Sequence, residues 1–406
     1  MYIFKAGVVG AGWMGGGIAQ VITYSGLPVV LKDIDQKMLD KGMDALRSIY
    51  QRRVDKGKMS AGEMQEKVDL VTATLSYDDF ADVDIIIEAV PEVMGIKKKV
   101  FAELEDVCPE HTIFATNTSA LSVSGMAAAT KRPSKVIGMH FFSPAHVMKL
   151  VEVIPGLDTS QETIDDVVNF AESLRKIAVV VQECPGFLVN RLLMPYLSEA
   201  TLALEEGAAT AREIDEAMTG FGWPMGPFTL MDMLGIDVIY HTAEYMSSEY
   251  GQETPPLFKM LFDAGRLGEK SGAGFYGYGD QTDEPVKAMI KQLQDEGKVP
   301  TGTEFGWERL MMPLINEAVL CVMENISAPD KIDMAAIAGI GMKYGEERMG
   351  PLQLADVLGL DTVLAGLEKF QAEHGDRFRP ARLLKTKVRA GHLGMKVGKG
   401  FFEYTV

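Results

Sequence analysis

The sequence of 406 residues has few cysteines and no long apolar run, and each of these absences excludes a class of protein. Its three cysteines, Cys108, Cys184 and Cys321, form neither a metal-binding spacing nor an even disulfide framework, so we expect free thiols in a reducing compartment. No apolar stretch approaches the roughly 20 residues that a membrane-spanning helix requires. The first predicted strand, residues 2–9, begins at once, so we expect no leader sequence and a cytoplasmic location.

Basic side chains are also fewer than acidic ones. Lysine and arginine number 40 against 57 aspartates and glutamates, which gives a formal net charge of −17. This excess of negative charge argues against non-specific binding to nucleic acid or to an anionic membrane. It does not exclude small anionic ligands, because a local cluster of basic groups can still bind a phosphate. The length exceeds that of one ordinary core, so we expect two or three domains.

The N-terminal segment contains a glycine fingerprint typical of dinucleotide binding. Residues 7–9 finish the first predicted strand, and Gly10-Ala-Gly12-Trp-Met-Gly15 and a predicted helix over residues 16–25 follow. In this pattern Gly10 allows a tight turn, Gly12 lets the backbone approach a pyrophosphate, and Gly15 lets the helix pack on the strand. The amides at the start of the helix then face the phosphates.

Asp33 follows the next predicted strand, residues 28–32. At the end of that strand its carboxylate can accept hydrogen bonds from the ribose of an adenosine. The same charge would repel the 2′-phosphate of NADP, and no arginine follows to offset it. The sequence therefore predicts NAD as the cofactor. Taken alone, Asp33 also fits a solvated turn carboxylate.

Strand-like and helix-like segments alternate after Asp33. We expect strands at residues 70–72, 84–90, 112–115, 135–141, 148–154 and 177–181, and helices that include residues 95–107 and 161–175. This alternation predicts a mostly parallel sheet covered by helices on both faces, with ligands beyond the carboxyl ends of the strands. The segments Val90-Pro-Glu92 and Asn117-Thr-Ser119 follow strands and are expected beside the cofactor.

His140 and Glu152 have the chemistry of an acid–base pair. A base is needed to oxidise an alcohol with NAD, and imidazole suits this role with an ordinary pKa of about 6.5. Of the six histidines, His140 alone ends an apolar strand near the expected cofactor. Glu152 lies within apolar residues 150–154, where a lone carboxylate would be costly, so a pair satisfies both groups. Taken singly, His140 fits a core histidine and Ser119 fits a helix cap.

Four residues in four separate short motifs carry a resemblance to a known family. The motifs are Asn-Thr-Ser119, Gly-Met-His140-Phe-Phe-Ser-Pro, Lys-Leu-Val-Glu152-Val and Cys-Pro-Gly-Phe-Leu-Val-Asn190-Arg. Their order and spacing, with the glycine fingerprint before them, resemble the 3-hydroxyacyl-CoA dehydrogenases of fatty-acid β-oxidation over nearly the whole chain. The resemblance implies reversible, NAD-dependent oxidation of an (S)-3-hydroxyacyl-CoA to a 3-oxoacyl-CoA.

The resemblance also implies roles for individual residues. His140 becomes the acid and base, Glu152 orients it, and Ser119 and Asn190 bind the substrate oxygens. The implied cofactor-binding residues are Gly10, Gly12, Met14, Gly15, Asp33, Val90, Glu92, Lys97, Asn117 and Ser143. Ser143 departs from the motif His-Phe-Phe-Asn-Pro that is common in the family, and we expect a modest effect on NAD affinity. No metal site is expected.

Residues 36–69 interrupt the alternation and are predicted to form two charged helices. Basic residues lie near the tip of this helical hairpin: Arg52, Arg53, Lys56 and Lys58. One interpretation is a solvated helical face. The other follows from the resemblance, since in the family this hairpin helps to hold the coenzyme A arm, whose phosphates a basic tip would suit.

The C-terminal half contains an internal repeat. Matched positions are Arg191 and Arg309, Glu199 and Glu317, Asp215 and Asp333, Asp232 and Asp356, and the segments 268–278 and 394–404. Asn190 has no counterpart, because Glu308 stands at its position in the second copy. We therefore expect one active site, with the second copy structural. The tandem arrangement resembles the dehydrogenase half of multifunctional β-oxidation enzymes, without the hydratase/isomerase domain in front.

The expected organisation is an α/β Rossmann-type NAD-binding domain followed by two tandem all-α C-terminal domains of the 3-hydroxyacyl-CoA dehydrogenase type. The predicted boundaries are 1–183 with the hairpin insertion at about 36–69, 184–280, a linker at 281–304, and 305–406.

The expected partners are the acyl-CoA substrate and a separate enoyl-CoA hydratase and thiolase, with neither nucleic acid nor a membrane. The chain would be a monomer with an internal pseudo-dimer, or a dimer. Two alternatives remain open: a dehydrogenase of a free hydroxy or sugar acid, and a non-catalytic structural relative that binds NAD.

Overall fold

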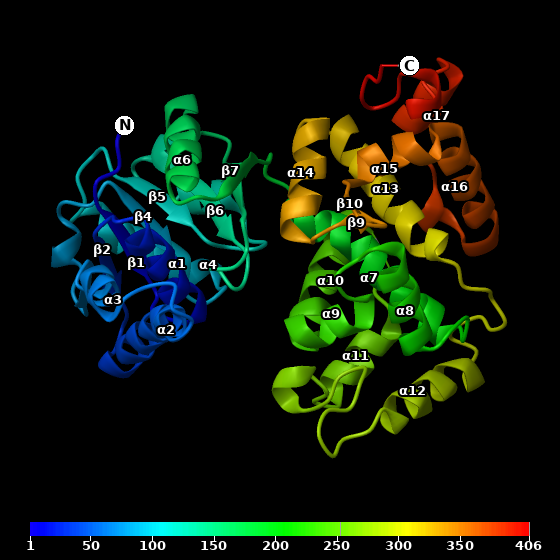
Figure 1. Cartoon of the computed structure of the whole chain (residues 1–406), viewed down its shortest axis with the longest axis horizontal. Coiled ribbons are helices and arrows are strands. Elements are labelled where there is room, and N and C mark those ends of the chain that lie inside the picture. Colours follow the sequence, from blue (N-terminus) through cyan, green and yellow to red (C-terminus); the bar gives the residue numbers. More distant parts are fainter. Residues whose placement is uncertain (252, 406) are drawn as a thin grey trace. The chain divides into compact units, whose positions relative to one another are not determined.

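The computed structural model describes residues 1–251 and 253–405. The chain divides into two compact units, Met1–Phe187 and Leu188–Val406, and each is described by itself (Figure 1). The first unit is built on a sheet, and the second is helical apart from one short strand pair. In the described parts of the chain, no helix has the length and apolar character needed to cross a membrane.

The first unit contains an eight-stranded sheet in the order β3-β2-β1-β4-β5-β6-β7-β8. The strands are β1 (Ala6–Val9), β2 (Val29–Lys32), β3 (Val71–Thr74), β4 (Ile85–Glu88), β5 (Ile113–Thr116), β6 (Val136–Phe141), β7 (Leu150–Pro155) and β8 (Ile177–Val180). Neighbouring strands are parallel, except that β6 and β7 are antiparallel. The mostly parallel sheet predicted from the sequence is confirmed.

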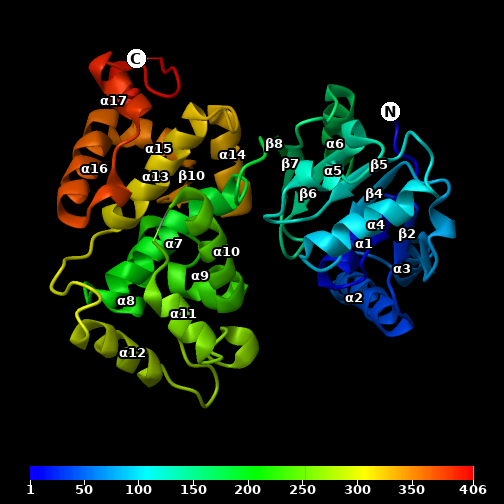
Figure 2. The same cartoon turned by 180° about the vertical axis from the view of Figure 1, so that it is seen from behind.

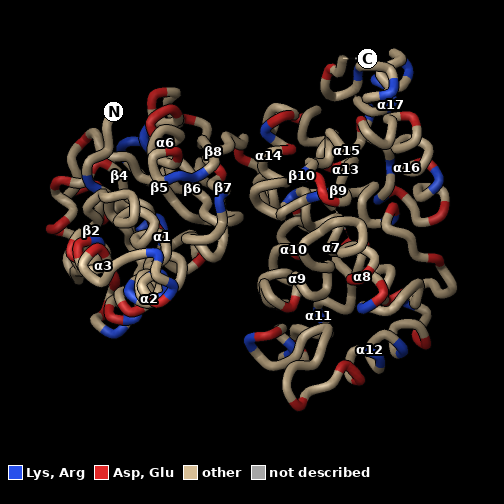
Figure 3. The backbone as a smooth tube through the Cα atoms, viewed as in Figure 1, with Lys and Arg blue, Asp and Glu red and all other residues tan. Residues whose placement is uncertain are grey.

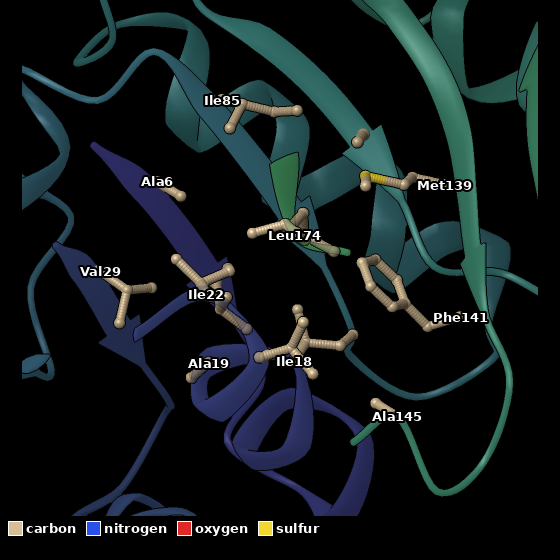
Figure 4. Packing of buried hydrophobic residues seen from close by; sticks show 14 of the residues in the cluster. Ala6, Ile18, Ala19, Ile22, Val29, Ile85, Met139, Phe141, Ala145 and Leu174 are labelled. Atoms are coloured by element: carbon tan, nitrogen blue, oxygen red, sulfur yellow. The ribbon is translucent and has the colours of Figure 1, made fainter. Parts of the chain in front are cut away.

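Helices cover both faces of this sheet (Figures 1 and 2). They are α1 (Trp13–Tyr24), α2 (Gln36–Asp55), α3 (Ala61–Val68), α4 (Met94–Glu105), α5 (Val123–Ala127) and α6 (Gln161–Ser173), with short 3-10 turns η1 (Asp78–Phe80) and η2 (Pro133–Lys135). Ile18 and Ile22 of α1 are fully buried and lie in one core with Phe141 of β6 (Figure 4). Burying a side chain of this size contributes about 1.5–3 kcal/mol. On the other face, the rings of Phe101 and Phe114 join α4 to β5.

Two expected boundaries at the N-terminus were wrong. The first strand begins at Ala6 rather than at residue 2, and the side chains of Tyr2 and Phe4 are exposed. The first helix begins at Trp13, three residues earlier than expected, because the backbone of Gly12 is already the extended N-cap. The earlier helix start places Gly12 at the N-cap and Gly15 within the first turn of the helix.

The hairpin at residues 36–69 consists of α2 and α3, and each helix starts at a side-chain cap. The carboxylate of Asp35 accepts a hydrogen bond from the amide of Met38 at 2.9 Å. At α3, Ser60 and Glu63 cap each other's backbone amides. These caps satisfy amides that have no partner within the helix, and each stabilises its helix by about 1 kcal/mol.

The second unit consists of two copies of one helical arrangement. The first copy contains α7 (Val189–Glu205), α8 (Ala211–Phe221), α9 (Pro227–Leu234), α10 (Ile236–Tyr250), α11 (Pro256–Asp263) and the 3-10 turn η3 (Glu269–Ser271). The second contains α13 (Trp307–Met323), α14 (Pro329–Gly339), α15 (Pro351–Leu358), α16 (Leu360–His374), α17 (Arg382–Arg389) and η5 (Met395–Val397). Each helix has the same length as its counterpart, and the repeat seen in the sequence is therefore a structural repeat.

Elements without a counterpart lie between the matched helices. The second copy adds the antiparallel strands β9 (Lys343–Tyr344) and β10 (Glu347–Arg348) and the 3-10 turn η4 (Asp376–Phe378). The segment expected as a linker is partly helical, because α12 (Glu284–Asp295) lies within it. Val286 and Leu293 are seven residues apart on α12 and are both buried, so the helix packs on the first copy through one apolar side.

A buried aspartate holds the C-terminal segment of each copy. Asp232 accepts the amides of the two residues that follow Gly274, at 2.8 and 2.9 Å. Asp356 accepts the amides of the two residues that follow Gly400 at the same distances. A Cβ atom at either glycine would lie 1.9 Å from the nearest carboxylate oxygen. The repeated glycine is therefore required by close approach of backbone and carboxylate.

The two copies bind each other through reciprocal ion pairs between α7 and α13. Arg191 of the first copy donates to Glu317 of the second at 2.6 Å. Arg309 of the second copy donates to Glu199 of the first at 2.7 Å. Both arginines are buried. This exchange of equivalent residues is the pattern of an isologous interface between two subunits, here formed within one chain.

The copies differ in how they stabilise a second buried aspartate. Asp215 accepts two backbone amides and two hydroxyl groups, one of which is the Tyr276 hydroxyl at 2.9 Å. Its counterpart Asp333 accepts two amides at 2.8 Å and no hydroxyl group from the described residues. Phe402 stands where the first copy has Tyr276. Burial raises the pKa of Asp333 to about 7.

We expect Phe402→Tyr to stabilise the second unit at pH 8 by about 1 kcal/mol through a new hydrogen bond to Asp333. The unfolded chain ionises an aspartate near pH 3.9. Because the folded pKa is higher, the stability from protonated Asp333 is complete below about pH 4 and is lost as the pH rises through about 7. The gain should therefore be smaller at pH 5, where the carboxyl is protonated. Urea unfolding at both pH values measures it.

Tyr276→Phe is the matched control for that substitution, since it removes the equivalent hydroxyl from the first copy. It should destabilise the protein at pH 8. An equal effect of Phe402→Tyr at pH 5 and pH 8 would contradict the assignment of the effect to Asp333.

Candidate active site

The carboxyl ends of four neighbouring parallel strands, β1, β4, β5 and β6, meet at one edge of the sheet. The glycine fingerprint follows β1, Glu92 follows β4, Ser119 follows β5, and His140 is the penultimate residue of β6. Ligands bind at this edge in open parallel sheets because the turns there present backbone amides and side chains toward the same space. The fold therefore brings segments more than 120 residues apart in sequence to one edge.

The glycine fingerprint has the geometry needed to receive a pyrophosphate. Gly10 has a φ of +100°, and a Cβ atom there would lie 2.5 Å from a backbone oxygen of the neighbouring strand end. A Cβ atom on Gly15 would lie 1.7 Å from the oxygen of Gly10, so the helix could not pack with a larger residue. At Gly12 no atom lies within 4 Å of the Cβ position, which leaves the backbone open at the start of α1. This open helix start suits an anion.

Asp33 stands between the end of β2 and the glycine fingerprint. One carboxylate oxygen accepts the amide of Ala11 at 2.6 Å, and the other accepts the amide of Ile34 at 2.6 Å. Each oxygen can accept a further hydrogen bond, which a ribose hydroxyl could donate. The same carboxylate therefore fixes the glycine turn and presents negative charge to the ribose position.

His140 and Glu152 lie opposite each other on the antiparallel strands β6 and β7. His140 Nδ1 is 2.8 Å from Glu152 Oε2, and both side chains are buried. Because the carboxylate accepts the proton on Nδ1, the neutral ring has its unprotonated nitrogen at Nε2. Phe142 and Phe187 flank the imidazole, with ring centroids 4.4 and 6.0 Å away. The arrangement can accept a proton at Nε2 and stabilise the resulting imidazolium.

The loop that contains Ser119 is held by Glu92 and by the end of β6. Glu92 Oε1 accepts the Thr118 hydroxyl at 2.5 Å and the amide of Ser119 at 3.0 Å. The side-chain oxygen of Asn117 accepts the amide of Phe141, the residue after His140, at 2.8 Å. The serine loop and the histidine strand are therefore fixed to each other.

Lys97 is buried between two carboxylates. Its ammonium group is 2.9 and 3.0 Å from the oxygens of Glu88 and 3.1 Å from Glu92. Burial would raise the pKa of Glu92, but the charge of Lys97 and the hydrogen bonds from the serine loop outweigh it, so this pKa lies below its ordinary value. Glu88 also accepts the Thr116 hydroxyl at 2.7 Å and the amide of Val90 at 2.7 Å.

The sequence analysis did not identify Glu88 as the buried carboxylate that pairs with Lys97. The signal that could have found it is the one that identified Glu152, a carboxylate within an apolar strand. Glu88 ends the run of three isoleucines in β4 and is fully buried. A carboxylate in that position requires a cation or several donors. Lys97, on the first half of α4, supplies the charge.

Ser143, which replaces the asparagine common in the family, contacts the glycine fingerprint. The indole nitrogen of Trp13 donates to the Ser143 hydroxyl at 3.0 Å. Met14, the next residue, packs partly against the hydrophobic core of the unit. The hydroxyl therefore joins the segment after β6 to the start of α1.

The four basic residues at the hairpin tip do not share one environment. The guanidinium of Arg53 donates to the Tyr24 hydroxyl at 2.9 Å and lies over the ring of that tyrosine. Arg52, Lys56 and Lys58 are exposed. Figure 3 shows that basic and acidic residues both occur along α2.

Asn190 belongs to the second unit. It is the second residue of α7 and is half-buried. Within residues 1–251 and 253–405, no cluster of histidine, cysteine, aspartate and glutamate could hold a metal ion.

Comparison with known proteins identifies relatives along the whole chain. The sequence profile of the 3-hydroxyacyl-CoA dehydrogenase NAD binding domain matches residues 5–184, and that of the C-terminal domain matches residues 186–278 and 305–404. A fatty acid oxidation complex subunit alpha from Psychrobacter arcticus is 40% identical over 402 residues, which cover 96% of this chain and 55% of that protein. The chain thus spans about half the length of the curated relatives it matches.

Solved structures of two 3-hydroxybutyryl-CoA dehydrogenases are also similar to this chain. The 3-hydroxybutyryl-CoA dehydrogenase from Escherichia coli K12 superposes with a TM-score of 0.85 at 29% identity, covering 96% of this chain and 99% of that one. The (S)-3-hydroxybutyryl-CoA dehydrogenase PaaH1 from Ralstonia eutropha is 38% identical, with a TM-score of 0.67, over 69% of this chain and 100% of that one.

We expect Lys97→Met to destabilise the first unit by about 3–5 kcal/mol, because it leaves the buried Glu88 without its cation. Urea unfolding at neutral pH measures the change. Lys99→Met on the same helix is the control, since Lys99 is 75% exposed, and it should alter stability by no more than about 0.5 kcal/mol. Equal effects of the two substitutions would show that the pair with Glu88 contributes little.

Proposed function

Because the chain belongs to the 3-hydroxyacyl-CoA dehydrogenase family, we propose that it oxidises (S)-3-hydroxyacyl-CoA thioesters to 3-oxoacyl-CoA with NAD, and catalyses the reverse reaction. The observation that carries this proposal is the buried pair of His140 and Glu152 at the sheet edge that also bears the glycine fingerprint. Binding a dinucleotide requires no such pair. The pair therefore favours an enzyme over a non-catalytic structural protein.

His140 acts as the general base in the direction of oxidation. Its Nε2 takes the proton of the 3-hydroxyl group, and Glu152, 2.8 Å from Nδ1, stabilises the positive charge that forms on the ring. In the direction of reduction the same nitrogen returns the proton to the 3-oxygen. NAD, when bound, accepts the hydride from the carbon.

Ser119 and Asn190 bind the oxygens of the substrate in this proposal. The amide of Ser119 is already used by Glu92, whereas its hydroxyl is 3.5 Å from that carboxylate, which is long for a hydrogen bond. The hydroxyl can therefore turn toward a ligand. Asn190 carries an amide that can donate to the 3-oxygen or to the thioester carbonyl.

NAD fits the residues present at the sheet edge. The open backbone at Gly12 suits the pyrophosphate, and Asp33 suits a ribose with free hydroxyl groups. Glu92 and Lys97 lie beside the serine loop, where the nicotinamide ribose would bind. Ser143 and Asn117 complete the proposed cofactor contacts, together with Val90 and Met14.

The coenzyme A arm would bind the tip of the helical hairpin. Arg52, Lys56 and Lys58 are exposed there and could contact its phosphates, whereas Arg53 is held by Tyr24. A dehydrogenase of a free hydroxy acid would need no such tip, so the exposed basic side chains favour the thioester.

We place the reaction in fatty-acid β-oxidation in the cytoplasm, with a separate hydratase supplying the substrate and a thiolase consuming the product. The names of the curated relatives support this context. The proposed architecture, one NAD-binding domain and two helical domains joined at 281–304, follows from the repeat.

The proposal is tested by NADH oxidation with acetoacetyl-CoA, run beside free acetoacetate and with NADPH in place of NADH. Turnover of the thioester with a strong preference for NADH supports it. Turnover of the free acid alone would overturn the coenzyme A assignment and retain the hydride chemistry. Tight NADH binding without turnover of acyl thioesters of any length would favour the structural alternative.

We expect His140→Gln to reduce turnover by a factor on the order of 10² to 10⁴ while NADH binds nearly as before, because the substitution removes the base and leaves the glycine turn intact. Turnover and the Kd for NADH measure the two effects. His111→Gln is the control, since His111 is exposed and lies beside Asp84, away from the sheet edge. A parallel loss of NADH binding would make His140 a structural residue.

We also propose that the chain is active as a monomer, because its two helical copies already satisfy each other's buried charges. Arg191 and Arg309 have their carboxylate partners within the same chain. Sedimentation of the active enzyme should give the mass of one chain. Obligate dimers that lose activity on dissociation would contradict this.

A further inference from the structure

The proposed substrate-binding residue Asn190 lies in the first turn of α7, directly before Arg191. The N-cap residue is Leu188, whose apolar side chain cannot accept a hydrogen bond from the helix amides. Asn190 and Arg191 are consecutive residues of one helical turn, so contacts that fix Arg191 also restrict the backbone that carries Asn190.

Arg191, the next residue, fixes this turn to the second helical copy. Its Nε donates to Glu317 of α13 at 2.6 Å, and one terminal nitrogen donates to Glu324, directly after α13, at 2.7 Å. The guanidinium also lies 4.7 Å from the ring centroid of Tyr250. The side chain is 2% exposed. A planar guanidinium held by two carboxylates and a ring is restricted in orientation, and this restricts the turn that carries it.

We propose that Glu317 and Glu324 are positioning residues for substrate binding, acting through Arg191 on Asn190. The inference rests on the proposed function for the role of Asn190. It gives the second copy a part in the single active site: the copy supplies no group that touches the substrate, and it sets the orientation of the helix turn that does.

The start of α13 contains the equivalent arrangement, and no proposed catalytic residue lies in it. Arg309 at the start of α13 donates to Glu199 at 2.7 Å and to Glu206 at 2.7 Å. The residue before Arg309 is Glu308, which stands where the first copy has Asn190. Arg377 also contacts Glu199 and Glu206, and Thr303 bonds to both Arg309 and Glu206, so the two sides are similar but not identical. A substitution at Glu199 therefore perturbs a comparable buried ion pair without directly affecting the first turn of α7, which carries Asn190.

The experiment compares Glu317→Gln with Glu199→Gln in the full chain. For each protein we would measure kcat and KM for acetoacetyl-CoA, the Kd for NADH, and the urea midpoint. We expect both variants to lose stability. Only Glu317→Gln should raise the KM, by about tenfold if the turn loses one substrate hydrogen bond worth about 1.4 kcal/mol, with the Kd for NADH unchanged. Glu324→Gln, at a half-exposed position, gives a second variant should Glu317→Gln fail to fold.

A double-mutant cycle with Asn190→Ala tests the route of the effect. If Glu317 acts through Asn190, then Glu317→Gln should add little to the kinetic loss caused by Asn190→Ala. Additive losses, or equal kinetics in Glu317→Gln and Glu199→Gln, would overturn the proposal.

Amide hydrogen exchange separates this inference from the proposed function. Glu317→Gln should speed exchange in residues 189–192 by about tenfold, and Glu199→Gln should not, whatever reaction the enzyme catalyses. Unchanged exchange in Glu317→Gln would overturn the positioning role even in an active enzyme. An inactive wild-type chain with the expected exchange would contradict the proposed function alone.

Discussion

A carboxylate buried among apolar side chains loses the hydration that stabilises its charge, and it must gain a cation or several hydrogen-bond donors in return. Glu152 meets this requirement through His140 across the β6–β7 pair, and Glu88 meets it through Lys97. Glu317 meets it through Arg191 in the helical unit. Each pairing fixes a side chain that the proposed reaction uses, or one directly beside it.

In the first unit these pairings join into one network around the serine loop. Lys97 links Glu88 to Glu92, and Glu92 holds the backbone of Ser119. The loop is in turn bound to the strand that carries His140. A change at the buried lysine therefore acts on the serine as well as on the stability of the sheet. Fixed geometry of this kind is what proton transfer requires, since the base must lie within hydrogen-bonding distance of the hydroxyl group.

In the helical unit the same requirement produces pseudo-symmetry. A duplicated helix pair exchanges arginine–glutamate contacts as two subunits of a symmetric dimer would. The copies differ at positions that the reciprocal ion pairs do not use. Asn190 is matched by Glu308, and Tyr276 is matched by Phe402, so Asp333 receives no tyrosine hydroxyl from that position. Burial raises the pKa of Asp333. The second copy provides the contacts that hold the first and has no counterpart of the asparagine that is proposed to bind a substrate.

The sequence alone determined the parallel sheet, the glycine fingerprint and the two-fold repeat. Each depends on local periodicity or on short motifs in a fixed order, and these can be recognised without knowledge of tertiary contacts. It also indicated the pairing of His140 with Glu152, since a carboxylate within an apolar strand signals a partner. It could not identify Glu88 as the partner of Lys97, nor place Arg53 on Tyr24. Those contacts join segments whose spacing along the chain carries no signal, and only the tertiary structure, by closing the sheet and packing the hairpin, brought the charges together.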